Sequence, residues 1–481
     1  MPRRIITTLL IGISLIVVAL LLYFRFQISM IRFFDSDEFG HMYRAYQLAS
    51  GLTIYKDFGY YYPPVFAGLI SPFFVNENIS AIFLSRSLMF FIFSLNCFLA
   101  YFIGKENNRF SAVLSALFIA GLPVILDKTL EIRPDNLALL LWLASFFFLL
   151  KWQKTLKTTF LVLTGICGGL SVCVITKSIF FYPGILATII FSSKKINHQS
   201  IRLLLRRLVK FHLAAVIPLL FLFLSFVFQG NLSSAVYSIF ILPVEVFRTY
   251  GTTYFVPFYP FSRVDAFYGL GGTSLPWIAS NAILIIGLLG LIKSRPRSFY
   301  LVSLLSLCVS VFFVFRLTLI QYYLPLFFLL ALSSAQALGR LSDLIYRHSL
   351  PIFSLFWLSL VALVSFSFWQ TAQIHFNWIN TGQINTIQTL LSVSLPTDYF
   401  FDAYGYHLFR PNGYYYCCEF YGDWQRYASR PLPSFETLME TRQTKYIYYN
   451  DHLGRLPPED QEYINTHFAP SGINNLLIRK P

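Results

Sequence analysis

Three acidic residues fall within four positions of one short stretch: Asp35, Asp37 and Glu38. The stretch follows directly on a long apolar run. A carboxylate beside a reacting hydroxyl group can take its proton as a general base. Acids also suit a divalent cation such as Mg²⁺ or Mn²⁺, because hard cations prefer oxygen ligands. Two acids do not complete such a shell, so a divalent cation stays open as a cofactor and no metal ligands are assigned.

The stretch from 33 to 51, FFDSDEFGHMYRAYQLASG, has the signals of a helix. Asp35 and Glu38 have the spacing of a capping box, and Ser50-Gly51 is a suitable stop. An apolar stripe on this helix is predicted to lie on the membrane surface; it comprises Phe39, Tyr43, Tyr46 and Ala49. Helix capping therefore explains Asp35 and Glu38.

Helix capping gives Asp37 no structural role. Its helical neighbours His41 and Arg44 add polar groups on a similar side. Structural and chemical roles for this segment therefore both stay open, with Asp37 a candidate for chemistry and Asp35, His41 and Arg44 candidate substrate-binding residues.

Basic residues in two later segments favour an anionic ligand. In the loop 127–135, DKTLEIRPD, the proline suits a first helical turn and Asp135 suits its dipole. Neither fact explains Arg133, whose paired donors are natural phosphate ligands. Lys177 interrupts an apolar stretch and could simply extend toward the membrane surface. Together with Arg133, it indicates an anionic headgroup.

The elements that position these residues must be membrane helices. Of the 481 residues, 56% are hydrophobic and 12% charged, with mean hydropathy +0.60, whereas soluble domains carry about 25% charged residues. We predict a mainly α, polytopic membrane protein with about eleven spans. The first span is read as a retained anchor, because no small-residue cleavage site follows it. The predicted spans are 5–24, 80–103, 110–126, 136–151, 158–176, 178–192, 209–229, 277–292, 298–315, 318–337 and 351–369.

Positive charges predict the orientation. With the N-terminus in the cytoplasm, the inside segments hold eighteen Lys and Arg residues, opposed only by Glu106 and Asp343. This asymmetry accounts for most of the net charge of +15, so no nucleic-acid partner is needed. We predict an integral protein of the plasma or inner membrane, in contact with membrane lipids.

Residues 1–369 form the predicted transmembrane domain, with external catalytic loops at 33–79, 127–135 and 230–276. Residues 370–481 contain ten of the 22 acids and alternate strand-like with helix-like stretches, which predicts a small extracytoplasmic α/β domain. Within it, Cys417 and Cys418 are adjacent and are not expected to pair with each other.

The motifs together resemble those of GT-C-type membrane glycosyltransferases, which include protein O-mannosyltransferases and aminoarabinose lipid A transferases. The resemblance covers roughly residues 1–340. Five motifs carry it, in order: DSDEFGHMYRAYQLASG, Pro63-Pro64, IRPDNLALLLW, GGLSVCVITKSIFFYPG and LIQYYLPLFFLLAL. Some relatives have a lysine just before the proline pair, where this chain has Tyr62.

The resemblance implies an inverting transfer of a sugar from a polyprenyl-phosphate donor to a protein, lipid or glycan acceptor. Asp37 matches the catalytic acid, and Glu38 would align the acceptor or the helix. Arg133 and Lys177 would hold the departing phosphate, and Asp135 would orient a sugar hydroxyl or Arg133. Tyr322 would line the carrier pocket.

Three alternatives stay open. A lipid or saccharide transporter or flippase would favour charges midway through spans. An O-antigen polymerase or ligase would centre on a large late loop and leave the first-loop acids unexplained. A non-catalytic relative would keep the fold and bind lipid.

Overall fold

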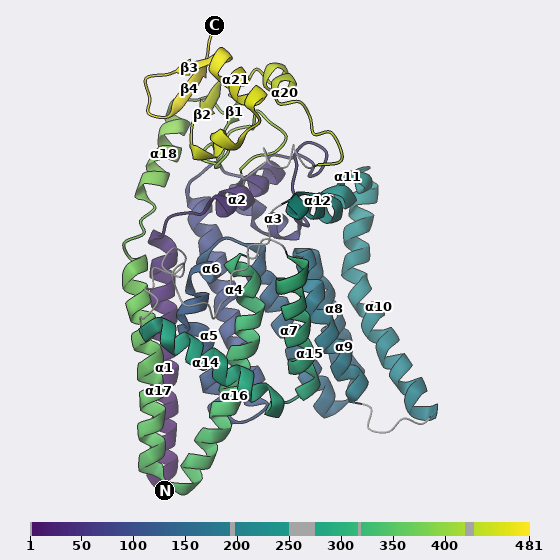
Figure 1. Cartoon of the computed structure of the whole chain (residues 1–481), viewed down its shortest axis with the longest axis vertical. Helices are drawn as coiled ribbons and strands as arrows, with labels where there is room; N and C mark the ends of the chain where they lie inside the picture. The colour runs from purple at the N-terminus through teal and green to yellow at the C-terminus, as the bar shows by residue number, and fades with distance from the viewer. Residues whose placement is uncertain (1, 193–197, 250–274, 316–318, 419–427) are drawn as a thin grey trace.

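The chain is an α-helical membrane bundle that carries a small mixed domain at one end (Figure 1). The computed structural model describes all residues except 1, 193–197, 250–274, 316–318 and 419–427. Most of the predicted external loop 230–276 therefore lies outside the described residues. We call the end under the C-terminal domain the domain end; the N-terminus lies at the opposite end.

Helices occur at all eleven predicted span positions. Among the described residues, eight helical segments are long and apolar enough to cross a membrane. They are α1 (Pro2–Ile31), α4 (Ser80–Lys105), α7 (Pro134–Thr155), α10 (His198–Phe228), α14 (Leu275–Gly290) continued by η5 (Leu291–Lys293), α15 (Arg297–Val309) continued by η6 (Ser310–Val314), α16 (Leu324–His348) preceded by η7 (Ile320–Tyr323), and α17 (Leu350–His375). The protein is thus an integral membrane protein.

The other three predicted spans are bent or short. α5 (Arg109–Gly121) meets the segment Pro123–Leu130, which contains α6 (Leu126–Leu130), at 56°, and the pair forms a ninth candidate. The remaining two are α8 (Thr158–Val174) and the segment Thr176–Phe191, which comprises η3 (Thr176–Phe181) and α9 (Tyr182–Phe191).

Glycines let α8 and α10 pack backbone to backbone. A Cβ atom on Gly165 would lie 2.5 Å from the carbonyl oxygen of Phe211, and one on Gly169 would lie 2.1 Å from that of Ala215. Small residues at helix contacts allow this close approach in membranes. The contact holds α10 against the helix that leads to Lys177.

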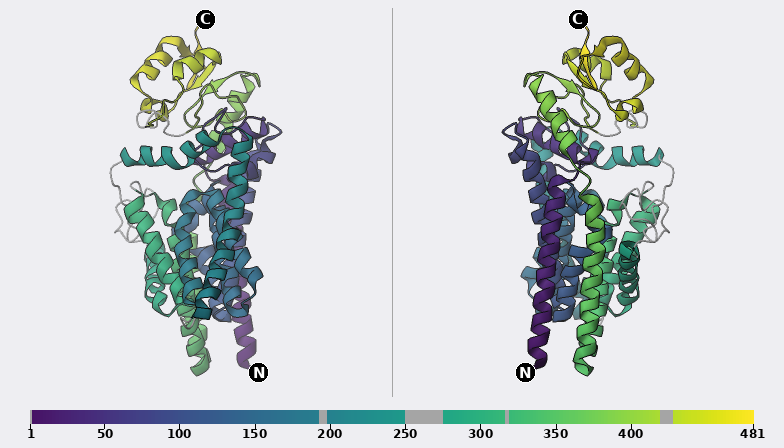
Figure 2. Two further views of the ribbon diagram at one scale, coloured as in Figure 1. Left: turned by 90° about the vertical axis from the view of Figure 1, so that its right-hand side faces the viewer. Right: turned by 90° about the vertical axis from the view of Figure 1, so that its left-hand side faces the viewer.

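Short elements cover the domain end of the bundle. They are α2 (Ser36–Ala49), α3 (Val65–Ile70), η1 (Ser71–Phe74), α11 (Leu232–Val236), η4 (Tyr237–Ile241) and α12 (Leu242–Thr249). α11 and α12 run across this end rather than along the bundle (Figure 2). On α2, the predicted capping box of Asp35 and Glu38 is confirmed, and the helix ends at Ala49, before Ser50.

The apolar stripe of α2 packs on protein, which corrects the expectation that it lies on the membrane surface. Phe39 packs against Tyr404 and Tyr406, and the Tyr43 ring lies 4.5 Å from that of His407. Tyr46 contacts Phe409 at 5.9 Å between ring centroids. The C-terminal domain, rather than lipid, therefore covers α2.

The C-terminal segment forms the predicted small α/β unit. The described part of this segment holds a four-stranded sheet in the order β1-β2-β4-β3, with β1 and β2 parallel and the other pairs antiparallel. Its elements are α18 (Thr381–Ser392), β1 (Phe400–Phe401), α20 (Phe435–Thr441), β2 (Tyr446–Tyr448), η8 (Asp451–Arg455), α21 (Pro458–His467), β3 (Phe468–Pro470) and β4 (Leu476–Arg479). Contrary to expectation, Cys417 and Cys418 form a disulfide with each other.

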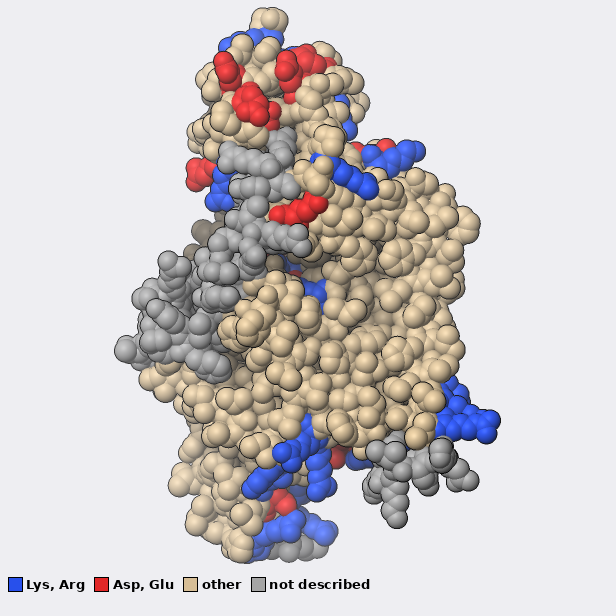
Figure 3. All heavy atoms as spheres, turned by 45° about the vertical axis from the view of Figure 1, so that its right-hand side comes forward, with Lys and Arg blue, Asp and Glu red and all other residues tan. Residues whose placement is uncertain are grey.

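Charged side chains gather near the two ends of the molecule. In Figure 3, uncharged residues cover most of the middle, while Lys and Arg cluster at the end away from the C-terminal domain. This distribution is the one expected for a bundle whose middle lies in lipid.

The α8–α10 contact predicts a specific stability loss. Replacing Gly169→Leu forces the two backbones apart, and such overpacking costs about 1–3 kcal/mol. Gly12→Leu is the matched control, since nothing lies within 4 Å of a Cβ atom there. Thermal unfolding in detergent, followed by intrinsic fluorescence, should show a lower midpoint for Gly169→Leu only. Equal midpoints would contradict the packing.

Candidate active site

Glu38 anchors the start of α2 inside the bundle. Its buried carboxylate accepts two hydrogen bonds from Arg86, at 3.0 and 2.7 Å, and one from the backbone N–H of Ile132 at 2.9 Å. It also accepts the backbone N–H of Asp35 at 3.1 Å, which completes the capping box. Glu38 is therefore fully engaged in holding α2 to α4 and to the loop before α7.

Asp37, one residue earlier, is partly exposed, with 23% of its side chain accessible. Its carboxylate contacts the guanidinium group of Arg133, which is buried. Arg133 also lies 3.2 Å from Glu131 and 3.6 Å from Asp135. Arg133 stands in extended backbone just before α7, so its position is fixed by the helix start.

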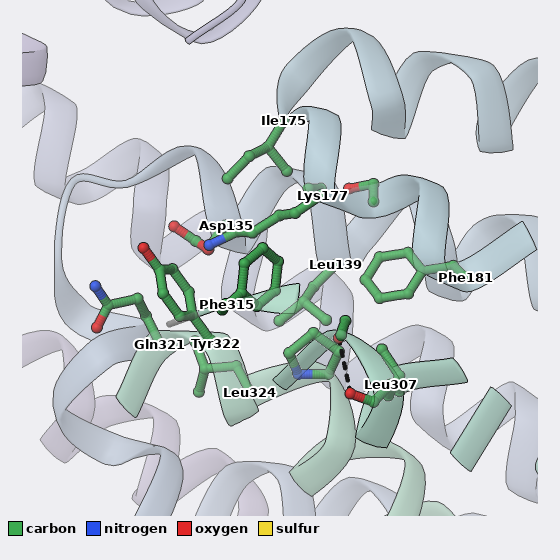
Figure 4. A pocket seen from close by; sticks show the side chains of 14 residues that line it. Asp135, Leu139, Ile175, Lys177, Phe181, Leu307, Phe315, Gln321, Tyr322 and Leu324 are labelled. Atoms are coloured by element: carbon green, nitrogen blue, oxygen red, sulfur yellow. Dashed lines mark hydrogen bonds and ion pairs between the residues drawn. The ribbon is translucent and has the colours of Figure 1, made fainter. Parts of the chain in front are cut away.

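Asp135 and Lys177 form the neighbouring ion pair, at 2.5 Å. The Lys177 ammonium group also lies 4.2 Å from the centre of the Tyr322 ring. Figure 4 shows Lys177 reaching Asp135 beside Tyr322, at the edge of a mainly apolar pocket. The pocket is lined further by Leu139, Ile175, Phe181, Leu307, Phe315, Gln321 and Leu324, among others.

A second group of charges supports the first from within the bundle. Arg32 contacts Asp127 at 2.6 Å and Glu131 at 3.1 Å, and Lys128 contacts Glu131 at 2.6 Å and Asp35 at 3.5 Å. Opposite charges alternate along the whole cluster. Its carboxylates are Asp35, Asp37, Glu38, Asp127, Glu131 and Asp135, and its cations are Arg32, Arg86, Lys128, Arg133 and Lys177.

Asp35 serves mainly as the cap of α2. Its carboxylate accepts the backbone N–H of Asp37 at 3.0 Å. Burial acts to raise the pKa of Asp35, but Lys128 and Arg133 outweigh it and lower the pKa below its usual value. Asp35 is therefore ionised at neutral pH.

His41 lies one turn after Asp37 and is buried. Its Nδ1 atom is 2.9 Å from the Tyr60 hydroxyl group. Burial, reinforced by the charges of Arg133 and Arg44, lowers the pKa of His41 well below its ordinary value. The imidazole is consequently neutral near pH 7.

Arg44 lies apart from the charged cluster. It donates hydrogen bonds to the carbonyl oxygen of Gly40 at 3.1 Å and to that of Cys417 at 2.6 Å. These bonds tie α2 to the C-terminal domain. The structure thus brings Asp35, Asp37, Glu38, His41, Arg133, Asp135, Lys177 and Tyr322 into one region and places Arg44 at the domain contact.

Comparison with known proteins agrees with this architecture. Residues 62–228 match a family model described as dolichyl-phosphate-mannose-protein mannosyltransferase. This part includes Arg133, Asp135 and Lys177 but not Asp37. None of the curated protein sequences matches the chain significantly.

Two crystal structures of the oligosaccharyltransferase of Archaeoglobus fulgidus are similar in fold. One, tethered to an acceptor peptide containing an NVT sequon, has a TM-score of 0.54 at 13% identity and covers 90% of this chain and 68% of that one. The other, with Zn and sulfate, has a TM-score of 0.50 at 13% identity and covers 94% and 71%. The chain has the GT-C-type fold. The resemblance noted in the sequence is thereby confirmed.

The acids of this site are engaged with basic side chains, and the divalent cation that the sequence left open is not assigned to them. Among the described residues, no group of three or more His, Cys, Asp or Glu side chains is arranged to hold a metal ion. Asp35, Asp37 and Asp135 each contact a lysine or arginine instead. These carboxylates therefore serve as partners in ion pairs.

The sequence interpretation missed the cations beneath the site. Arg86 lies inside the predicted span 80–103, where a charged residue is costly and therefore marks a partner or a function. That signal could have found Arg86. Nothing in the local sequence pairs Arg32 with Glu131, since the two residues are far apart along the chain.

The Glu38–Arg86 pair predicts a non-additive loss of stability. Removing one partner of a buried ion pair costs about 3–5 kcal/mol, because the other charge is left uncompensated. Arg86→Met should therefore lower the thermal midpoint strongly, and adding Glu38→Gln should recover part of it. Arg347→Met, which breaks the exposed Asp343 pair, should cost about 0–1 kcal/mol. Additive losses in the Arg86–Glu38 double variant would disprove the coupling.

Proposed function

We propose that this GT-C-type protein transfers a sugar from a polyprenyl-phosphate donor to an acceptor hydroxyl group on the extracytoplasmic side of the membrane. The acceptor is a protein, a lipid or a glycan. One observation carries the proposal: the partly exposed Asp37 carboxylate contacts Arg133 beside the Asp135–Lys177 pair, at the edge of a mainly apolar pocket.

In the proposed reaction, Asp37 accepts the proton of the acceptor hydroxyl group as that oxygen attacks the anomeric carbon. The bond between the anomeric carbon and the phosphate oxygen breaks, and its electron pair leaves with the phosphate. The attack comes from the face opposite the phosphate, so the sugar configuration inverts. Negative charge builds on the phosphate, where fixed cations lower the barrier most effectively.

Arg133 and Lys177 are the proposed phosphate ligands. Asp135 lies 2.5 Å from Lys177 and 3.6 Å from Arg133, so it can hold both cations in place. Glu38 acts as a positioning residue, because its carboxylate is buried and occupied by Arg86. Arg44 positions α2 against the C-terminal domain, so it no longer belongs among the proposed substrate ligands.

The mainly apolar pocket beside Lys177 suits the first isoprene units of the carrier. Tyr322 and Phe315 lie at the end near the ion pair, and Leu139, Leu307 and Leu324 line the rest (Figure 4). A lipid with its phosphate at Lys177 would place its chain in this pocket. The rest of the carrier chain would then remain in the surrounding bilayer.

The proposed orientation puts the N-terminus in the cytoplasm and the C-terminal domain outside, following the positive-inside rule. Because nucleotide sugars are cytoplasmic, a site at the domain end requires a lipid-linked donor. The clustering of charge at this end favours transfer over transport, in which binding groups near the membrane midplane are expected.

Asp37→Asn should abolish turnover. Purified protein in lipid is supplied with a panel of polyprenyl-phosphate sugars and a crude acceptor extract, and free polyprenyl phosphate is quantified. Loss of a general base reduces the rate by about 10²–10⁴. Asp343→Asn, in the exposed pair with Arg347 near the C-terminal end of α16, should behave as wild type. Equal release by wild type and Asp37→Asn would remove Asp37 from the mechanism.

Lys177→Met should weaken both donor binding and turnover, because it removes a cation from the leaving phosphate. We expect a loss of about 10²–10³ in kcat/KM for the donor, the size seen when one stabilising donor is removed. Lys445→Met is the control, since Lys445 pairs with Asp398 in the C-terminal domain. Unchanged kinetics in Lys177→Met would place the phosphate elsewhere.

A further inference from the structure

The His41 ring presents one nitrogen that the protein leaves unused. His41 is 1% exposed, and its Nδ1 atom is taken by the Tyr60 hydroxyl group at 2.9 Å. Its Nε2 atom has no hydrogen-bond partner among the described residues. Buried polar atoms are nearly always paired in folded proteins, so an unpaired one within a site needs a partner from outside the chain.

The position of His41 relates this nitrogen to the reacting groups. His41 and Asp37 are four residues apart on α2, so their side chains lie on the same face of the helix. Burial and, after it, the charge of Arg133 lower the pKa of His41, as expected for a ring on the Arg133 side of the site. Because burial keeps the ring neutral, it is not a third cation for the phosphate.

Aromatic rings pack around the His41 ring. The Tyr62 ring is centred 5.2 Å from His41 and 4.3 Å from Tyr61, and it is only partly buried. Burial, followed by the neighbouring Tyr322 and Asp135, raises the pKa of Tyr62 well above its ordinary value, and its hydroxyl group therefore stays neutral.

We propose that His41 Nε2 hydrogen-bonds one hydroxyl group of the transferred sugar and that the Tyr62 ring packs on the C–H face of the same sugar. This inference rests on the proposed function and deepens it by assigning the sugar subsite. It requires a sugar with a free hydroxyl group at one defined ring position.

A hydroxyl group suits either form of the histidine. The Tyr60 hydroxyl group either donates to Nδ1 or accepts from it, which makes Nε2 a donor or an acceptor respectively. A sugar hydroxyl group can both donate and accept. An aromatic ring adds apolar contact area without charge, which fits the carbon side of a sugar ring.

Two substitutions test the roles of the two ring nitrogens of His41 separately. The amide of His41→Asn can replace Nδ1 and keep the Tyr60 bond, whereas that of His41→Gln reaches the position of Nε2. Each variant is assayed in lipid with the donor that wild type uses and with its monodeoxy analogues. Wild type should prefer the parent sugar over one analogue by at least about 100-fold in kcat/KM. A site that hydrogen-bonds a hydroxyl group discriminates strongly against an analogue that lacks it. His41→Asn should lose most of that preference, and His41→Gln should keep part of it.

Tyr62 is tested in the same assay. Tyr62→Phe keeps the ring and should behave nearly as wild type, whereas Tyr62→Ala should raise the donor KM about tenfold, the lower end for one lost apolar contact. Thermal midpoints verify that each variant is folded. One outcome is that wild type releases polyprenyl phosphate while His41→Asn distinguishes the parent sugar from its deoxy analogues as well as wild type does. In that case the proposed sugar subsite is wrong and the proposed function stands. If wild type releases polyprenyl phosphate from no donor, the proposed function and this inference fall together.

Discussion

The candidate site depends on one buried carboxylate. Glu38 is the point at which α2, α4 and the loop before α7 are joined, through Arg86 and the backbone N–H of Ile132. Arg86 in turn donates to the backbone carbonyl oxygens of Arg32 and Phe33, just before α2. The same few atoms therefore fix where the membrane helix ends, where α2 begins and how α2 is turned. Because Asp37 directly precedes α2's anchor, its direction toward Arg133 follows from that fixation.

Burying so many charges is tolerable because each one has partners of opposite sign. A lone ion in a membrane bundle is very unfavourable, and a buried pair at best roughly balances its desolvation cost. The cluster thus contributes little to stability and much to the definition of geometry. Its inner members, Glu38 and Arg86, are inaccessible, whereas Asp37 keeps about a quarter of its side chain exposed. Accessibility, rather than residue type, separates the supporting carboxylate from the one that can meet a substrate.

The sequence predicted the features that depend on interactions between neighbouring residues. Hydropathy located the helices, and the spacing of Asp35 and Glu38 located the start of α2, because caps and apolar runs act over a few residues. Contacts between segments that are far apart along the chain were not predicted. The stripe on α2 looked suited to a membrane surface, but Tyr404 and His407 cover it. Arg44, predicted as a candidate substrate ligand, donates a hydrogen bond to the carbonyl oxygen of Cys417, which its local sequence does not reveal. An amphipathic helix shows that one face must be covered, but its sequence does not say by what.

The Asp37–Arg133 contact bears on the order of events in the proposed reaction. The Asp37 carboxylate is held by the guanidinium group of Arg133 in the empty site. A donor phosphate that binds Arg133 would compete with Asp37 for the same N–H groups. Asp37 would then be released toward an acceptor hydroxyl group once the donor is bound. Because Asp135 holds both Arg133 and Lys177, the two cations can shift toward the phosphate without leaving that carboxylate unpaired. The alternation of charges would in this way link donor binding to activation of the acceptor.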